Sequence, residues 1–145
     1  MAIERADFPL PDLADPLVGP FFAAAAAGEL RITACPRCDR FVWYPEGPCA
    51  ACGATLEWRQ VSGAATLFSW VIVRRAFLPA FADRVPFVSA LVALVEDSTI
   101  RLCSYIVDAD FDGLRHDMAL RVVFRELRFS TVPDREVVVP MFVPA

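Results

Sequence analysis

Strand-like runs of hydrophobic residues with few polar ones follow one another along most of the chain, and ELRITAC at 29–35 alternates with the two-residue period of a β-strand. The runs that carry this pattern are rich in β-branched and aromatic residues, and most end at Gly, Pro, Asp or Ser. The pattern therefore predicts a mainly β protein. The runs are ELRITAC, TLEWRQVS, ATLFSWVIVRRAF, PFVSALVALVE, TIRLCSYIVD, ALRVVFREL and EVVVPMFVP, at positions 29–35, 55–62, 65–77, 86–96, 99–108, 119–127 and 136–144.

One segment departs from the strand pattern and predicts a short helix near residues 20–27. Gly19 and Pro20 are typical of a helix start, because proline fits the first turn, where its missing N–H is not needed. The alanines at 23–27 have the highest helix propensity of any residue. Gly28 suits the left-handed position that follows the last turn.

The run at residues 65–73 is apolar on both of its predicted faces. Such a strand is expected to be buried on one side and covered on the other. One face would carry Leu67, Ser69, Val71 and Val73, and the other Thr66, Phe68, Trp70 and Ile72. Further on, Asp97 and Ser98 predict a tight hairpin turn between two strands.

Four of the five cysteines form two Cys-x-x-Cys pairs that are separated by ten residues. Two such turns, brought together by a hairpin, complete a closed tetrahedral Cys₄ site for Zn²⁺, which is structural because no position stays open for water or substrate. Iron in a rubredoxin-like site would use the same ligands, and a pair of redox-active motifs would need a strand-to-helix context that is missing here. The predicted ligands are Cys35, Cys38, Cys49 and Cys52.

The order of these segments predicts the architecture. Five or six strands after the cysteines, with no long helix among them, favour a small closed barrel, and a five-stranded barrel of the OB type fits best. We therefore expect an N-terminal arm and helix at 1–28, a rubredoxin-like zinc ribbon at 29–56 and an OB-fold barrel at 57–145.

The composition shows a surplus of apolar residues and excludes some catalytic mechanisms. The chain is 57% hydrophobic and 22% charged, with a mean hydropathy of +0.46, so it can bury a full core and leave apolar surface for a partner. Its net charge is −4, which gives no general attraction to nucleic acid. All fourteen basic residues are arginine, which excludes a Schiff-base or phosphate-loop lysine.

No targeting or membrane segment is expected from the sequence. The first residues, MAIERADF, carry acids before any apolar run, unlike a signal peptide. The longest apolar stretch, at 85–95, is too short to span a bilayer. We expect a cytoplasmic protein, where thiols stay reduced and paired cysteines usually bind metal.

The residues with potentially reactive side chains form no self-sufficient catalytic set. His116 is the only histidine, and its polar surroundings predict an exposed loop. Cys103 lies in the middle of a predicted strand, where a free buried cysteine acts as a small hydrophobe. The acids of VDADFDG at 107–113 resemble a calcium loop but lack its distal glutamate, since Ala119 stands there, so a solvated turn is expected.

Arg74 and Arg75 end a long strand next to aromatic residues. Arginine beside aromatics at a barrel mouth can hold a phosphate or an adenine ring. The alternative is a surface pair at a strand end, and the sequence leaves both open.

The segments PFFAAAAAGELRITACPRC, PCAACGATLEWRQVSGAATLFSWVIV, VPFVSALVALVEDSTIRLCSYIVD, MALRVVF and VPMFVPA resemble the DUF35 family of zinc-ribbon and OB-fold proteins. Phe22, Gly28, Leu30 and Cys35 keep the spacing of that family, and the likeness covers the chain from about residue 17. Three positions depart from it. Asp39 and Asp117 stand where glycine is usual, and Tyr44 takes one place of a common Pro-Pro.

The resemblance implies a function that composition does not. Members of this family are small partner subunits of thiolase-like or sterol-carrier-thiolase-like enzymes, which form or cleave C–C bonds next to a CoA thioester. The resemblance implies that catalytic residues belong to the partner and that acyl-CoA is bound nearby, with Arg74 and Arg75 as candidates for the CoA phosphate or adenine.

Two other functions stay open at this point. Zinc ribbons and OB barrels both bind single-stranded nucleic acid elsewhere, although a strand-tracking groove needs concentrated positive charge. A stand-alone acyl-CoA enzyme that uses His116 is the other.

Overall fold

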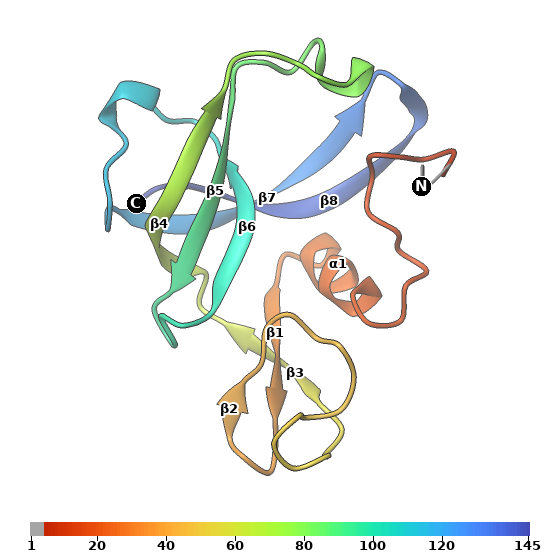
Figure 1. Cartoon of the computed structure of the whole chain (residues 1–145), viewed down its shortest axis with the longest axis vertical. Coiled ribbons are helices and arrows are strands. Elements are labelled where there is room, and N and C mark those ends of the chain that lie inside the picture. The colour runs from red at the N-terminus through yellow and green to blue at the C-terminus, as the bar shows by residue number, and fades with distance from the viewer. Residues whose placement is uncertain (1–4) are drawn as a thin grey trace.

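Two β-structures follow one another in the computed structural model, which describes residues 5–145 (Figure 1). The first is a three-stranded antiparallel sheet in the order β2-β1-β3. Its strands are β1 Leu30–Cys35, β2 Arg40–Phe41 and β3 Glu57–Val61. The predicted N-terminal arm begins outside the described residues and is seen from Arg5 onward.

The second structure is a closed barrel of five strands in the order β4-β5-β6-β8-β7. This confirms the predicted five-stranded barrel. Short 3₁₀ turns, η1 Pro79–Phe81 and η2 Phe111–Gly113, interrupt two of its loops. The barrel strands are β4 Ala64–Val73, β5 Phe87–Leu94, β6 Arg101–Ile106, β7 Ala119–Phe129 and β8 Val132–Pro144.

The predicted helix is also confirmed, as α1 Gly19–Ala26, with proline in its first turn. Gly28 follows the helix with φ +77°, in the left-handed region where glycine is favoured. Ala24 and Ala25 are the buried face of α1, which contacts both β1 and β8. Within residues 5–145, no helix has the length and apolar character needed to cross a bilayer.

The predicted alternation of β4 is wrong beyond Leu67. A β-bulge between Leu67 and Ser69 shifts the pairing with β5 by one residue, and a one-residue shift exchanges the two faces of a strand. Leu67 is therefore fully buried, whereas Val71, predicted on the same face, is 57% exposed. Trp70 and Ile72 pack against the core instead.

The barrel closes through a narrow parallel contact. All other barrel pairings are antiparallel, but β6 and β8 run parallel and share one registered pair, Ile106↔Phe142. The N–H of Val107 donates to the carbonyl of Phe142 at 2.9 Å. The closure is therefore short on this side of the barrel.

Two buried clusters stabilise the molecule. The larger one joins Leu30 and Ile32 of β1 to barrel residues such as Leu67 and Phe142, so the ribbon sheet and the barrel share one core. The second cluster lies between β7, β8 and the N-terminal arm, where Leu10 has no exposed surface. The arm is thus anchored by a buried side chain.

Candidate metal centre

The four paired cysteines meet at the end of the ribbon sheet. Cys35 closes β1 and is buried, and Cys38 follows in the turn to β2 and is exposed. Cys49 is buried and Cys52 is half-buried, and both belong to the loop before β3. The four sulfur atoms all lie within 4.8 Å of one another.

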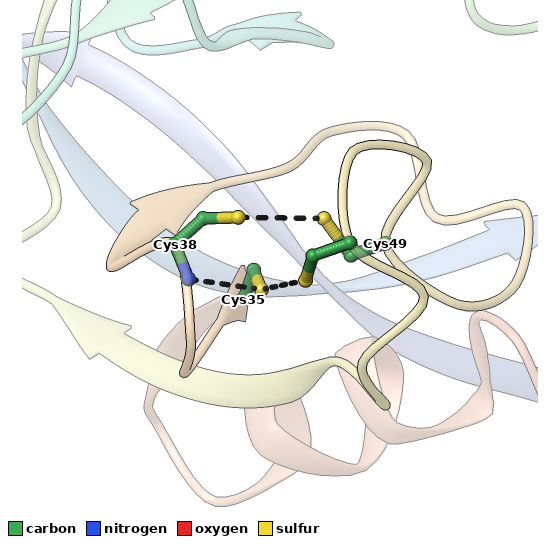
Figure 2. Close-up of side chains that lie close together, drawn as sticks. Cys35, Cys38 and Cys49 are labelled. Carbon is green, nitrogen blue, oxygen red and sulfur yellow. Dashed lines mark hydrogen bonds between the residues drawn. The ribbon is translucent and has the colours of Figure 1, made fainter.

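The spacing of these sulfurs fits one tetrahedral metal ion. Sulfurs around Zn²⁺ with Zn–S bonds of about 2.3 Å lie about 3.8 Å apart. The Sγ atoms of Cys35 and Cys52 are separated by 3.5 Å. Those of Cys38 and Cys49, which Figure 2 joins by a dashed line, are separated by 4.0 Å. Four protein sulfurs fill a tetrahedron, so such a site leaves no position for substrate.

Backbone N–H groups of both turns favour the thiolate form that a metal needs. The N–H of Cys38 donates to Cys35 Sγ at 3.3 Å, as Figure 2 shows, and lowers the pKa of Cys35. Backbone N–H groups of Ala51 and Cys52 lower the pKa of Cys49 to about 6.

Crowding of the sulfurs has the opposite effect on one of the four cysteines and raises its pKa. Side-chain hydrogen bonds with neighbouring sulfurs, Cys52 first, raise the pKa of Cys38 to about 12. A fourth thiolate is therefore unfavourable beside the others unless a cation compensates their charge, which a bound metal ion does.

The residue after each Cys-x-x-Cys pair has left-handed backbone. Asp39 has φ +52° and Gly53 has φ +76°. Each N–H closes its turn, from Asp39 to the Cys35 carbonyl at 2.8 Å and from Gly53 to the Cys49 carbonyl at 2.7 Å. The two turns thus repeat one local structure with different residues.

Aromatic rings near the metal centre join the ribbon to the rest of the molecule. Trp43 lies 5.2 Å from Phe21 of α1 and 6.3 Å from Trp58, measured between ring centroids. Phe41 and Trp43 pack against the larger buried cluster. Tyr44 is 54% exposed, and its ring lies edge-on to that of Trp43 with the centroids 5.5 Å apart.

His116 lies in an exposed loop, as predicted. Its Nδ1 is 2.9 Å from the carbonyl of Phe68, and its Nε2 is 3.3 Å from a carboxylate oxygen of Asp117. The acids at 107–113 form exposed turns, where Asp108 pairs with Arg125 at 2.6 Å. Within residues 5–145, neither His116 nor the acids at 107–113 form a cluster with a nucleophilic side chain.

Cys103 is exposed, which corrects the expectation of a buried residue. Leu102 and Ile106 take the inward positions of β6, and the alternation directs Cys103 outward. In RLCSYI the face of Cys103 also carries Arg101, and the opposite face carries Ser104, so each face mixes polar and apolar residues and the pattern did not distinguish the two orientations.

Arg74 and Arg75 follow β4 and are both exposed. The guanidinium of Arg75 lies 5.8 Å from the centroid of the Phe77 ring. A second stacked arginine, Arg101, was not anticipated and lies 3.8 Å from the centroid of the Phe68 ring. The two partners are more than thirty residues apart in sequence, so no local pattern indicates this pair.

Two family models match adjacent parts of the chain. One describes the rubredoxin-like zinc ribbon domain of ChsH2 and matches residues 22–58. The other describes the C-terminal OB-fold domain of ChsH2 and matches residues 58–125. A probable enoyl-CoA hydratase alpha subunit from Thermomonospora curvata is 30% identical over 127 residues, which are 86% of this chain and 36% of that protein. The chain thus spans about a third of the length of this curated relative.

Solved structures agree with both matches. A chain of the Ltp2-ChsH2(DUF35) aldolase is similar with a TM-score of 0.75 and 27% identity, over 92% of this chain and 98% of that one. A DUF35 protein of unknown function from Sulfolobus solfataricus shares the fold, with a TM-score of 0.55 and 16% identity over 75% and 78% of the two chains. The matches to the zinc ribbon and to the barrel, in this order, show that the chain belongs to the DUF35 family.

Proposed function

We propose that this chain is a non-catalytic subunit of an acyl-CoA enzyme. It binds a thiolase-like or lipid-transfer-protein-like partner that forms or cleaves a C–C bond next to a CoA thioester. The likeness to a chain of the Ltp2-ChsH2(DUF35) aldolase carries this proposal, because it extends over 98% of that chain. The curated relative, a probable enoyl-CoA hydratase subunit, supports CoA thioesters as the substrate class.

The chemistry of the described residues supports a non-catalytic role. The chain has no lysine, and its only histidine lies in an exposed loop whose near neighbours are a carbonyl and a carboxylate. A general base needs a reacting group within hydrogen-bond reach inside a shaped site. Catalytic groups are therefore assigned to the partner.

We further propose that Cys35, Cys38, Cys49 and Cys52 hold one structural Zn²⁺. The sulfur spacing and the ribbon-family match support this assignment. Bound there, the ion would supply no reaction chemistry, since all four positions are taken by protein sulfur. It would hold the loop before β3 against the end of β1.

Exposed apolar side chains form a candidate surface for binding the partner. Phe77 is 84% exposed, Val71 57% and Leu78 45%, and all three lie on β4 or the loop that follows it. Large exposed apolar groups close together mark protein interfaces. Arg74 and Arg75 lie in the same segment and remain our candidates for the CoA phosphates or adenine.

The test is purification of the tagged full chain from its native host, followed by identification and reconstitution of the partner. The expected result is a thiolase-like partner whose complex with this chain turns over an acyl-CoA, while this chain alone does not. Turnover by the isolated chain would contradict the proposal, as would a reconstituted partner whose rate is the same with and without it.

A further inference from the structure

The narrow closure of the barrel leaves an opening along one edge of β6. Because β6 and β8 share only the pair Ile106↔Phe142, residues 101–105 have no registered strand partner on the side away from β5 within the described chain. Phe21 and Phe22 of α1 lie across this opening, with their rings edge-on and centroids 5.2 Å apart. What remains between helix and strand is a groove.

Three adjoining hollows make up this groove, with volumes of about 420, 180 and 450 Å³. The first and second share Phe21, Phe22 and Leu102 as walls, and the second and third share Tyr105. Cys103 lines all three. We call this continuous surface the β6 groove.

The walls of the β6 groove are mostly apolar, and several of their polar groups are already engaged. In the first hollow, Asp12 and Asp15 each accept the backbone N–H two residues ahead, at 3.0 and 2.8 Å. In the second, the Ser104 hydroxyl donates to a β8 carbonyl at 3.0 Å. The polar side chains of the walls therefore leave few groups for a polar ligand to pair with, whereas a hydrocarbon needs none.

A partner strand is also excluded by space. An added strand would have to lie about 4.8 Å from β6 to form a ladder. Phe21 and Phe22 occupy that side of β6, and they pack against the larger and the smaller buried cluster respectively. Removing them would open both cores.

One end of the β6 groove leads to positive charge. Val71 and Val73 of β4 line the third hollow, and the chain continues directly into Arg74 and Arg75. Neither arginine has a carboxylate partner within residues 5–145. Neither arginine lines the third hollow itself, but both follow its wall directly in sequence, so the β6 groove fits a ligand with a long apolar part and an anionic end.

We infer that the β6 groove binds the acyl chain of a CoA thioester, with the CoA phosphates toward Arg74 and Arg75. The CoA thioester as ligand class rests on the proposed function, and the groove gives it a place on this chain. The acyl chain lies along Cys103 between α1 and β6.

Cys103 supplies a direct reporter, because it is the exposed cysteine outside the metal centre. The zinc-loaded full chain is treated with iodoacetamide, and the rate of Cys103 alkylation is followed by intact mass and peptide mapping. Acetyl-, butyryl-, hexanoyl- and octanoyl-CoA should protect Cys103 with affinities that rise about twofold to fourfold per added CH₂, because each methylene buries apolar surface. Octanoate without CoA should bind more weakly than octanoyl-CoA, since it lacks the phosphates.

Two variants locate the site. Cys103→Phe places a ring where all three hollows meet and should weaken octanoyl-CoA binding at least tenfold by calorimetry. Ala119→Phe, at an exposed position of β7 outside the β6 groove, is the matched control and should bind as the wild type does. Arg74→Ala should weaken every CoA ester by a similar factor and leave the dependence on chain length unchanged.

Three outcomes would overturn the inference while leaving the proposed function intact. One is equal protection by CoA and octanoyl-CoA, and another is octanoyl-CoA binding that Cys103→Phe leaves unchanged. The third is protection of Cys103 by the partner protein but by no CoA ester, either alone or in the complex. The groove would then be a protein interface.

Discussion

At the scale of single residues, backbone conformation explains two positions where aspartate replaces a usual glycine of the family. Asp39 and Asp117 have φ +52° and +64°, both in the left-handed region. Aspartate enters this region more readily than most residues with a Cβ. Asp39 also accepts a hydrogen bond from Arg59 at 2.8 Å, which links its turn to β3. The turns therefore persist despite the substitutions.

The metal centre gives the first prediction. Cys35→Ser or Cys49→Ser should reduce the zinc content from about one ion per chain to nearly none, because a structural zinc site requires all four ligands. Elemental analysis and circular dichroism measure the loss of metal and of folded structure. Cys103→Ser is the matched control and should keep its zinc, since Cys103 lies outside the cluster. A Cys49→Ser protein that stays fully folded with no metal would contradict the structural role.

A second prediction concerns pH and the turn between β5 and β6. The hydroxyl and N–H of Thr99 donate to Asp97 Oδ1 at 2.6 and 3.0 Å and lower the pKa of Asp97 from its ordinary value of 3.8. Because the folded pKa is the lower one, this contribution is present above pH 3.8 and is lost as the pH falls through the folded value. Asp97→Asn should lower the free energy of unfolding by about 0.5–1 kcal/mol at pH 7.

The difference between wild type and Asp97→Asn should shrink as urea unfolding is repeated at pH values below the ordinary pKa. Asp83→Asn serves as the control, because Asp83 is an exposed acid whose side chain makes no hydrogen bond or ion pair within residues 5–145. A difference that is constant from neutral to strongly acidic pH would show that the Asp97 charge does not stabilise the turn.

The metal ligands could be predicted from sequence because their spacing alone brings the sulfurs together. The orientation of Cys103 could not, since both faces of its strand mix polar and apolar residues. Its exposure is decided by which residues of β6 face the barrel, and this depends on pairing with β5. The binding of CoA by Arg74 and Arg75 also remains a prediction.

At the scale of elements, strand runs and the alanine-rich helix were predictable because their local composition agrees with their final structure. The two-residue strand β2, within the cysteine loop, was not, because two residues, Arg40 and Phe41, are too few to show a strand period, and their pairing with β1 depends on the turn between the two strands. The bulge in β4 was also missed. An extra residue in an apolar strand leaves no mark in the sequence, yet it decides that Val71 is exposed.

The junction between β3 and β4 gives a third prediction. Gly63 has φ +84°, and a Cβ built there would lie 2.2 Å from Cγ1 of Val122. Gly63→Ala should therefore destabilise the protein by about 2–4 kcal/mol, from backbone strain and from the displacement of Val122. Thermal and urea unfolding measure this loss.

Gly28→Ala is the matched control for Gly63→Ala. Its φ is +77°, but no atom lies within 4 Å of a Cβ built there, so only the backbone cost of about 1 kcal/mol is expected. Adding Val122→Ala to Gly63→Ala should recover part of the lost stability. Equal losses for the two glycine variants would show that contact with Val122 does not matter.

At the scale of the whole molecule, the closure of the barrel produces both its core and its groove. The number of predicted strands indicated a five-stranded barrel. The single registered pair between β6 and β8 could not be predicted, because it arises from tertiary structure and no local sequence pattern indicates it. The opening that it leaves is covered by α1, far away in sequence. Domain limits at residues 28 and 56 remain predictions, while the larger buried cluster continues across both the ribbon and the barrel.

This shared core gives the last prediction. Removing the metal with a strong chelator should destabilise the barrel as well as the ribbon, because Leu30 and Ile32 of β1 are buried in one cluster with Leu67 and Phe142. Hydrogen exchange should show faster amide exchange in β5 and β6 after chelation, although the four cysteines of the metal centre lie on neither strand. Leu30→Ala should lower the free energy of unfolding by about 2–5 kcal/mol while the metal is retained. It would thus reproduce the loss of the shared core without the loss of metal. If β5 and β6 exchange at the same rate with and without metal, ribbon and barrel fold independently, and the metal stabilises only the loop it binds.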